Sequence, residues 1–439
     1  MSFIVCKFGG SSVADSAMFQ QVARILKKDP SRRYIVLSAP GKRDSRDKKI
    51  TDLLYRCHAV RHNPTDFEAE YSRVRERFLE IARAFSLESH MEQWLAESQP
   101  LLLSDADSAA SRGEYLCARL FAEFASLPFV DAKELICFDE GGQLDEEASY
   151  SAIRKALSNL PFAVIPGFYG AMPDGRLRTL KRGGSDVTGA LVARAMGADL
   201  YENWTDVDGV LTADPKLFPD AVPVTRISYA QMGLLSRLGA SVLHPDSIKP
   251  LFDACIPTRV RNTRRPLAPG TLITTESGVS APCVSGTTGL SMLRAYAPAE
   301  ACLNKLMGKV PLEGIFSAYD RTDLIVRTSE LSVMQHALTG IICTPPRGVA
   351  VIAAVWNGRP RLADTLCRLL SGLISGIQHT QSGCLLLLTG EETYLEVLTR
   401  LRNEIRGMPS PSDAAFPHAF PYETPENIPS MPTPMKIIG

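Results

Sequence analysis

Short apolar runs alternate along the first half of the chain with longer segments whose apolar residues recur at helical spacing. Residues 3–8, 34–40 and 162–170 are such runs, and each leads into glycine, serine or proline. Segments 14–25 and 147–158 carry the helical spacing. An uninterrupted apolar run is typical of a strand buried on both faces. The alternation predicts an α/β fold with a mainly parallel central sheet covered by helices on both faces.

The pattern changes after a proline-rich passage at residues 266–282. Beyond it, short apolar strands such as 349–355 and 384–388 alternate with helix-like segments. The last thirty or so residues are rich in proline, which favours an extended or disordered tail. The predicted domains are 1–280, 281–408 and the tail 409–439.

The start of the chain carries the first candidate for chemistry. An apolar run ends in Lys7, and Gly9, Gly10 and Ser11 follow before a helix-like pattern. Glycines at a strand–helix junction let the backbone approach a ligand closely, and the N–H groups of a helix start favour an anion such as phosphate. An ordinary turn has the same appearance. The Walker pattern and the spaced dinucleotide fingerprint are both absent from the sequence.

A second Gly-Gly pair stands at another predicted helix start. Lys181 and Arg182 precede Gly183 and Gly184, and Asp186 follows them. An acidic residue in a first helical turn is common for structural reasons alone. Two basic Gly-Gly loops in one chain favour a ligand site.

Other polar stretches are open to two interpretations. Glu114 at a helix start could simply complement the helix dipole, and the polar segment 204–216 resembles a surface loop. The charged segment 41–49 suits a mobile, solvated loop, and the residues 65–98 suit amphipathic helices with a solvated face. His244, which precedes a proline, is expected to have a structural hydrogen-bonding role.

Composition narrows the function classes. The 439 residues are 45% hydrophobic, and 48 basic residues balance 48 acidic ones, which argues against a nucleic-acid partner or an anionic membrane. Ten scattered cysteines show no metal-ligand spacing, so no metal site is predicted. No signal peptide and no run of about 18 apolar residues is present, so we expect a cytoplasmic protein that binds small polar ligands.

Four motifs together resemble the aspartokinases of the amino-acid kinase superfamily. They are residues 7–13, 182–186, 205–210 and 239–245, in the order found in that family. The resemblance covers about the first 275 residues closely and the remainder more loosely. It implies a three-layer amino-acid-kinase domain followed by α+β ACT-like (ferredoxin-like) regulatory domains.

The resemblance implies phosphoryl transfer from ATP, with Mg²⁺ carried by the nucleotide, to the side-chain carboxylate of L-aspartate. This reaction would be the first step of lysine (diaminopimelate), threonine and methionine biosynthesis. Lys7 would hold the transferring phosphoryl group and Asp186 would orient Lys7. The backbone N–H groups of Gly9, Gly10 and Ser11 would surround the phosphates.

The same resemblance implies the remaining contacts. Arg182 would grip a carboxylate of aspartate and Glu114 would pair with its ammonium group. The other expected substrate residues are Ser38, Thr51, Gly183, Gly184 and Ser185. The other expected nucleotide residues are Thr205, Asp206, Leu211, Asp214, Lys216 and Ser241. Three of these depart from the family, which often has tyrosine, arginine and lysine where Leu211, Lys216 and Ser241 stand.

The C-terminal region resembles tandem ACT domains, which implies a homodimer or higher homo-oligomer and a regulatory amino acid. Lysine is the favoured effector, and a purely structural pair of domains is the alternative. The matching polar positions are Asp323, Thr328, Ser329 and Glu330. Two further functions stay open: a sister kinase acting on another carboxylate or on a nucleotide monophosphate, and an amino-acid sensor with an inactive kinase domain.

Overall fold

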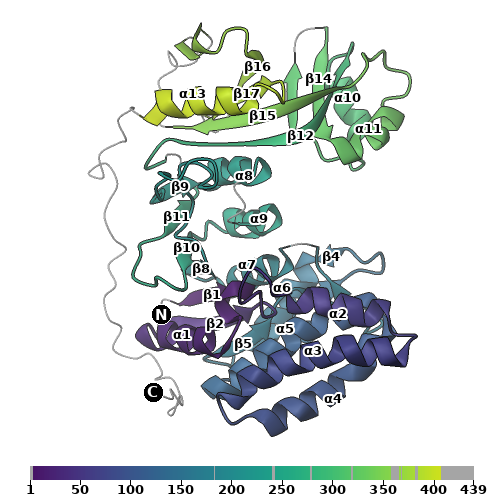
Figure 1. The fold of residues 1–439 in the computed structure, drawn as a ribbon, viewed down its shortest axis with the longest axis vertical. Helices are drawn as coiled ribbons and strands as arrows, with labels where there is room; N and C mark the ends of the chain where they lie inside the picture. The colour runs from purple at the N-terminus through teal and green to yellow at the C-terminus, as the bar shows by residue number, and fades with distance from the viewer. Residues whose placement is uncertain are drawn as a thin grey trace. The chain divides into compact units, whose positions relative to one another are not determined.

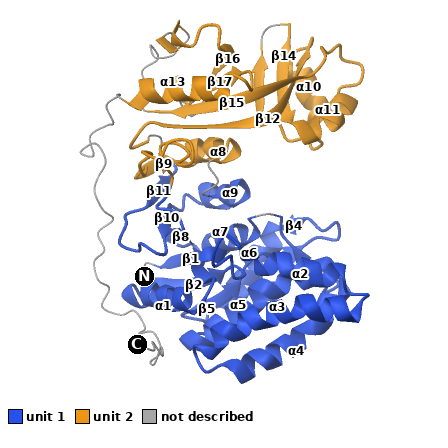
Figure 2. Cartoon of the chain, in the orientation of Figure 1, with its two compact units in different colours: residues 1–209, 243–275, 419–439 blue, residues 210–242, 276–418 orange. Residues whose placement is uncertain are grey.

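The computed structural model describes residues 3–181, 183–239, 243–276, 279–317, 320–356, 365–366, 368–380 and 384–406. The chain divides into two compact units (Figure 2). Unit 1 comprises residues 1–209, 243–275 and 419–439, and unit 2 comprises residues 210–242 and 276–418. The predicted boundary near residue 280 remains a prediction, since the units add segment 210–242 to the C-terminal part.

A mainly parallel sheet is the centre of unit 1 (Figure 1). Its strands in this unit lie in the order β5-β2-β1-β8-β10-β11, all parallel to their neighbours except β11, which is antiparallel to β10. This confirms the predicted sheet. The strands are β1 (Ile4–Phe8), β2 (Arg32–Leu37), β5 (Ala163–Pro166), β8 (Leu200–Thr205), β10 (Thr258–Asn262) and β11 (Thr271–Thr274).

Helices cover both faces of this sheet, and every residue of β1 is buried. Ile4, Cys6 and Phe8 belong to the core shared with the first five helices, so by strand alternation Val5 and Lys7 face the other side, where α7 packs. The helices are α1 (Ser16–Lys28), α2 (Ile50–Ala59), α3 (Pro64–Arg83), α4 (Glu88–Ser104), α5 (Ala106–Ala125), α6 (Glu146–Leu157), α7 (Gly184–Met196) and α9 (Pro245–Asp253), with 3-10 turns η1 (Gly10–Val13) and η2 (Ala132–Glu134).

A smaller four-stranded sheet completes unit 1, in the order β4-β3-β6-β7. Its strands are β3 (Cys137–Phe138), β4 (Leu144–Asp145), β6 (Tyr169–Ala171) and β7 (Leu177–Thr179). The predicted run 162–170 is therefore two strands: β5 belongs to the large sheet, and β6 to the small one. Phe168 between them has φ 78° and so turns the chain from one sheet to the other.

Unit 2 contains a six-stranded antiparallel sheet in the order β13-β14-β12-β15-β17-β16. One half of that sheet consists of β12, β13 and β14, and the other of β15, β16 and β17. Each half has its own apolar core. This agrees with the predicted pair of ACT-like domains. The elements are β9 (Arg226–Ser228), α8 (Tyr229–Arg237), β12 (Cys283–Ala295), α10 (Ala299–Leu306), β13 (Gly314–Ser317), β14 (Thr322–Arg327), η3 (Thr328–Glu330), α11 (Leu331–Ala337), β15 (Arg347–Val355), β16 (Ile374–His379), β17 (Cys384–Thr389) and α13 (Tyr394–Arg406).

Segment 210–242 joins unit 2 through its apolar side chains. Ala213 and Phe218 lie in the core that α13 forms with β15 and β17. Asp220 accepts hydrogen bonds from Arg402 (2.7 Å) and Arg406 (2.5 Å) of α13. Among the described residues, no helix is both long and apolar enough to cross a bilayer. The predicted tail 409–439 lies outside the described residues.

Candidate functional site

The carboxyl ends of the parallel strands gather the candidate residues of unit 1. Lys7 is the penultimate residue of β1, Ser38 follows β2, Gly167 follows β5 and Thr205 ends β8. Strand β1 has β2 on one side and β8, which comes much later in the chain, on the other. Such a reversal of strand order is where open α/β sheets bind ligands.

Lys7 and Asp186 form an ion pair, with 2.6 Å between Nζ and Oδ1. Both side chains are largely buried, at 10% and 14% exposure. Asp186 lies in the first turn of α7, and its Oδ1 also accepts a hydrogen bond from Asn203 Nδ2 at 3.2 Å. The two glycine loops therefore meet through their charged residues, as expected if Asp186 orients Lys7.

One of the predicted donors in the loop after β1 is engaged within the protein. The Gly9 N–H donates to the Trp204 carbonyl at 2.9 Å, and its binding of phosphate stays a prediction. No described residue accepts a hydrogen bond from the N–H of Gly10 or Ser11. A side chain at Gly9 would begin 3.6 Å from Lys7 Nζ, in the space where a ligand of Lys7 would lie.

The Trp204 carbonyl is a shared hydrogen-bond acceptor for this loop. It also accepts from Ser12 Oγ at 3.3 Å, and Ser12 Oγ lies 2.7 Å from Thr263 Oγ1. On the side-chain side, the indole Nε1 donates to Glu202 at 3.0 Å. Burial raises the pKa of Glu202, but the charges of Arg32 and Arg261 outweigh burial and hold it below its usual value. Glu202 thus stays ionised and fully paired inside the sheet.

Glu114 is the second carboxylate near Lys7, and its surroundings are different. It lies in the interior of α5 with 5% exposure, and its Oε2 has no hydrogen-bond partner among the described residues. Burial raises its pKa to about 8, although the Ala39 backbone and the charge of Lys7 partly oppose that shift. An unpaired buried carboxyl group is costly unless a partner arrives. The helix-dipole interpretation is wrong, because Glu114 is not in the first turn.

Ser38 and Thr51 lie at the same edge of the sheet. The Ser38 N–H donates to the Phe8 carbonyl at 3.1 Å, which places Ser38 beside the end of β1. Thr51 is in the first turn of α2, whose start is attached to the adjoining loop by a 3.3 Å hydrogen bond from the Ile50 N–H to the Pro40 carbonyl. Both side chains are partly exposed.

The second glycine loop packs tightly. Gly183 has φ 78°, and a Cβ there would overlap the His244 ring at 2.2 Å. A Cβ at Gly167 would meet that of Ser185 at 2.6 Å. His244 caps α9 by accepting from the Asp246 N–H through Nδ1 at 3.3 Å, which confirms its structural role. The glycines thus let α7 begin close to its neighbours.

The expected nucleotide residues fall into both units. Thr205 ends β8 and Asp206 follows it in unit 1, where the Thr205 carbonyl accepts from the Thr263 N–H at 2.9 Å. Leu211, Asp214 and Lys216 belong to unit 2, and Asp214 accepts from the Lys216 N–H at 2.9 Å. Arg182 and Ser241, two further predicted site residues, lie outside the described residues.

The expected effector residues lie at β14 and η3 of unit 2. Asp323 forms an ion pair with Arg294, which donates to both carboxylate oxygens at 2.6 and 2.7 Å. Thr328 Oγ1 donates to the Gly289 carbonyl at 2.9 Å. Within the described chain, neither a hydrogen bond nor an ion pair engages the Glu330 carboxylate, and Ser329 lies beside it in η3.

Sequence reasoning missed Asn203, Trp204 and Thr263 as parts of the site. The strand 200–205 did carry a signal, because Glu202 and Asn203 are polar residues in an otherwise buried run. The contribution of Trp204 is made by its backbone carbonyl, and no side-chain pattern indicates such a role. Nowhere in the described ranges do three or more His, Cys, Asp or Glu side chains form a group suited to a metal ion.

Comparison with known proteins gives a consistent family. The model of the amino acid kinase family matches residues 2–262. Aspartokinase 3 of Bacillus subtilis is 34% identical over 289 residues, which are 62% of this chain and 63% of that protein. Aspartokinase 1 of Arabidopsis thaliana, chloroplastic, is 31% identical over 359 residues, 75% of this chain and 62% of that protein. This chain therefore spans less than two thirds of these relatives.

Solved structures agree with the sequence relatives. The aspartate kinase of Clostridium acetobutylicum is 32% identical with a TM-score of 0.76, and the match covers 92% of this chain and all of that one. Aspartokinase III of Escherichia coli, solved with aspartate and ADP, is 23% identical with a TM-score of 0.76, over 92% of this chain and all of that one. The second likeness shows a shared fold.

Proposed function

This chain belongs to the amino acid kinase family, as one of its aspartokinases, and we propose that it transfers the γ-phosphoryl group of ATP to the side-chain carboxylate of L-aspartate. The product is 4-phospho-L-aspartate. The observation that carries the proposal is the Lys7–Asp186 pair near the buried Glu114, whose Oε2 has no partner among the described residues, at the carboxyl edge of the sheet.

The reaction needs positioning and charge neutralisation. A carboxylate oxygen of aspartate forms a bond to the γ-phosphorus while the bond to the β–γ bridging oxygen breaks, and ADP leaves with that electron pair. The acceptor carboxylate is already ionised at neutral pH, so no general base has to remove a proton. That requirement agrees with a site whose central groups are a lysine and carboxylates.

Lys7 supplies the positive charge for the transferring group. Asp186 at 2.6 Å and Asn203 behind it restrict the Lys7 ammonium to one place. The N–H groups of Gly10 and Ser11, which donate to no described residue, are suited to phosphate oxygens. Mg²⁺ would enter with the nucleotide, since it is usually held by substrate phosphates, and it would neutralise charge on them.

Glu114 would recognise the ammonium group of aspartate. Its unpaired Oε2 and its raised pKa both indicate a carboxyl group that lacks a cation in the free protein. Arg182 would bind a carboxylate of the same substrate, with Ser38, Thr51, Gly183, Gly184 and Ser185 around it. A substrate with one ammonium and two carboxylates matches this set of charges.

Unit 2 would carry regulation by an amino acid, with lysine as the first candidate. One relative, from Escherichia coli, is named lysine-sensitive aspartokinase 3 and is 29% identical over 75% of this chain. Arg294 occupies Asp323, so Glu330 is the carboxylate best placed to receive an effector ammonium. Self-association of this unit would follow from exposed apolar side chains on α10 and α11, including Leu303 and Val333.

One assay tests the proposed reaction. ATP-dependent formation of an acyl phosphate is trapped with hydroxylamine across a panel of aspartate, glutamate and acetylglutamate. Turnover with aspartate alone is the expected result. Turnover with glutamate but not aspartate would indicate a sister kinase, and no turnover with any acceptor would favour an amino-acid sensor. Adding lysine, threonine or methionine to the aspartate assay tests regulation, and unchanged rates with all three would remove that part of the proposal.

A further inference from the structure

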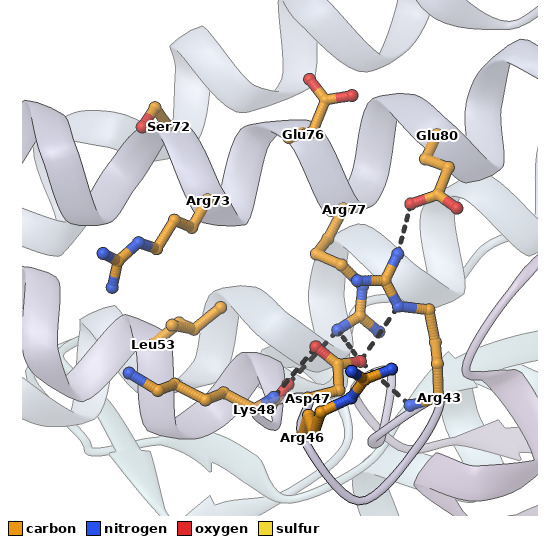
Figure 3. Close-up of a pocket in the computed structure, with 10 residues that line it drawn as sticks. All are labelled: Arg43, Arg46, Asp47, Lys48, Leu53, Ser72, Arg73, Glu76, Arg77 and Glu80. Atoms are coloured by element: carbon orange, nitrogen blue, oxygen red, sulfur yellow. Dashed lines mark hydrogen bonds and ion pairs between the residues drawn. The ribbon is translucent and has the colours of Figure 1, made fainter.

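Arg77 organises the charged loop 41–49, which the sequence pattern predicts to be mobile and solvated. Arg77 belongs to α3, and its residue exposure is 5%. It lies at a pocket of about 600 Å³ between α3 and the loop (Figure 3). One guanidinium nitrogen, Nη1, donates to Asp47 Oδ2 at 2.6 Å and to the Lys48 carbonyl at 3.3 Å. The loop is therefore attached to the helix by a buried cation.

Asp47 accepts further hydrogen bonds from within the loop. Its Oδ2 accepts from the backbone N–H of Arg43 at 2.9 Å and from Arg43 Nε at 3.0 Å, and its Oδ1 accepts from the Lys48 N–H at 2.9 Å. Although burial raises the pKa of Asp47, these hydrogen bonds and the charge of Arg77 lower it to about 2. Asp47 is therefore ionised beside Arg77 at neutral pH.

The other guanidinium nitrogen reaches toward the glycine loop of the site. Arg77 Nη2 donates to the Ala14 carbonyl at 3.2 Å and to the Gly41 carbonyl at 3.0 Å. Ala14 is the C-cap residue directly after η1, the turn that begins at Gly10. One side chain on α3 therefore binds the end of that turn and the start of the charged loop together.

Gly41 in turn contacts the glycine loop directly. Its N–H donates to the Gly10 carbonyl at 2.8 Å. A Cβ at Gly41 would lie 2.7 Å from the Gly10 carbonyl carbon and 2.8 Å from the Ser11 nitrogen. A Cβ at Gly10 would lie 2.8 Å from the Ala39 carbonyl. The backbones touch with no side chain between them, so a shift of Gly41 must move Gly10 and Ser11.

We propose that Arg77, with Asp47 as its counter-ion, is a positioning residue that holds the Gly10 and Ser11 N–H groups in place for the phosphates of the nucleotide. The inference deepens the proposed function and rests on it. Arg77 itself touches neither substrate. It acts by binding the carbonyls of Ala14 and Gly41, which would otherwise be buried without these donors.

The test compares three variants in the full-length protein. Arg77→Met removes the guanidinium group, and Arg77→Lys keeps the charge but lacks the planar fork that serves two sides at once. Arg75→Met is the matched control, because Arg75 is on the same helix, is half exposed and pairs with Glu92 on the surface at 3.2 Å. The measurements are MgADP affinity by calorimetry, KM for ATP and KM for aspartate.

We expect MgADP affinity and KM for ATP to worsen by roughly tenfold to a hundredfold in Arg77→Met, because displaced binding groups lose that much. Arg77→Lys is expected to restore little of the loss. KM for aspartate should change less than twofold, and Arg75→Met should match the wild type. A folded Arg77→Met protein with wild-type MgADP affinity would overturn the proposal. So would equal losses for both substrates, because that result indicates a general structural role.

Asp47→Asn decides the matter if Arg77→Met does not fold. It keeps the shape of the side chain, removes the charge and replaces one acceptor oxygen by an amide group, so we expect a smaller loss of MgADP affinity in the same direction, about threefold to tenfold. Unchanged affinity would overturn the proposal. MgADP binding does not depend on the acceptor, so inactivity of the wild type on aspartate would contradict the proposed function while these binding results still judge the role of Arg77.

Discussion

Two carboxylates lie near Lys7, and their surroundings differ: Asp186 is in an ion pair and Glu114 is not. Asp186 contacts the lysine at 2.6 Å, accepts from Asn203 and keeps 14% of its side chain exposed. Glu114 is buried in α5, has an oxygen without a partner among the described residues, and has a pKa raised to about 8 by burial. The first carboxylate is the ion-pair partner of Lys7, and the second forms no ion pair among the described residues.

The different surroundings of Asp186 and Glu114 suit two different roles in the site. A paired carboxylate can orient a lysine but has little capacity left for a substrate ammonium. An unpaired, largely protonated carboxyl group has that capacity, at the expense of stability. The proposed function therefore assigns the phosphoryl side of the site to Asp186 and the acceptor side to Glu114, and substitutions at the two positions should fail in different ways.

The largest effect on activity is expected when the Lys7–Asp186 ion pair is broken. Lys7→Met and Asp186→Asn should each lower kcat roughly a thousandfold, because charge stabilisation of the transferring group is lost. Steady-state kinetics with aspartate and ATP measure it. The control is Lys249→Met, which removes an exposed lysine paired with Asp253 at 2.5 Å. A wild-type rate in either site variant, with the control also active, would refute the assignment of this pair.

Removing the unpaired carboxyl group should affect acceptor binding instead. Glu114→Gln is expected to raise KM for aspartate roughly a hundredfold, since a buried charge pair with the substrate ammonium cannot form. KM for ATP should stay within about twofold of the wild type. Glu123→Gln, on the exposed face of the same helix, is the control. Equal changes in both KM values would mean that Glu114 supports the whole site and does not recognise aspartate.

Much of this comparison could be predicted from the sequence, and some of it could not. The parallel sheet follows from apolar runs that alternate with helical patterns, and the contact of Asp186 with Lys7 follows from two basic Gly-Gly loops in a family order. The burial of Glu114 does not follow, because a glutamate one turn or two turns into a helix has the same local sequence pattern. Its environment is made by residues distant in the chain, such as Ala39 and Lys7.

The contacts of loop 41–49 could not be predicted from the sequence either. Its charges predict a solvated loop, yet Asp47 and the main-chain groups of the loop bind Arg77. Arg77 precedes Phe78 at the border of an amphipathic helix, and periodicity cannot say whether a border arginine turns inward. The Gly9 N–H is another case, since its acceptor is a backbone carbonyl from β8.

The raised pKa of Glu114 gives the binding of aspartate a pH dependence. Below about pH 8, Glu114 in the free protein is protonated, and an aspartate ammonium must displace that proton. KM for aspartate should therefore fall by up to about tenfold per pH unit toward pH 8 and then level off. At pH 7, binding should release about one proton, which calorimetry in buffers of different ionisation enthalpy detects. Glu114→Gln should show neither effect.

The contribution of Glu114 to the free energy of unfolding changes with pH in the direction opposite to that of a paired carboxylate with a lowered pKa. The folded protein holds the Glu114 proton up to about pH 8, whereas an unfolded glutamate loses it near pH 4.3. The contribution of Glu114 to the free energy of unfolding is therefore largest below that range and falls as the pH rises toward 8. Glu114→Gln should be more stable than the wild type at pH 9. Equal denaturation midpoints there would contradict the raised pKa.

The smallest effect is expected at Asn203, which separates orientation from charge. Asn203→Ala leaves the Lys7–Asp186 pair in place but removes the second partner of Asp186 Oδ1, so the carboxylate can rotate. We expect kcat to fall about tenfold, as for a hydrogen bond to a charged group, with little change in either KM. Because Asn203 would act through Asp186, adding Asn203→Ala to Asp186→Asn should cost almost nothing more. A further tenfold loss in the double variant would show that Asn203 acts on the reaction independently of Asp186.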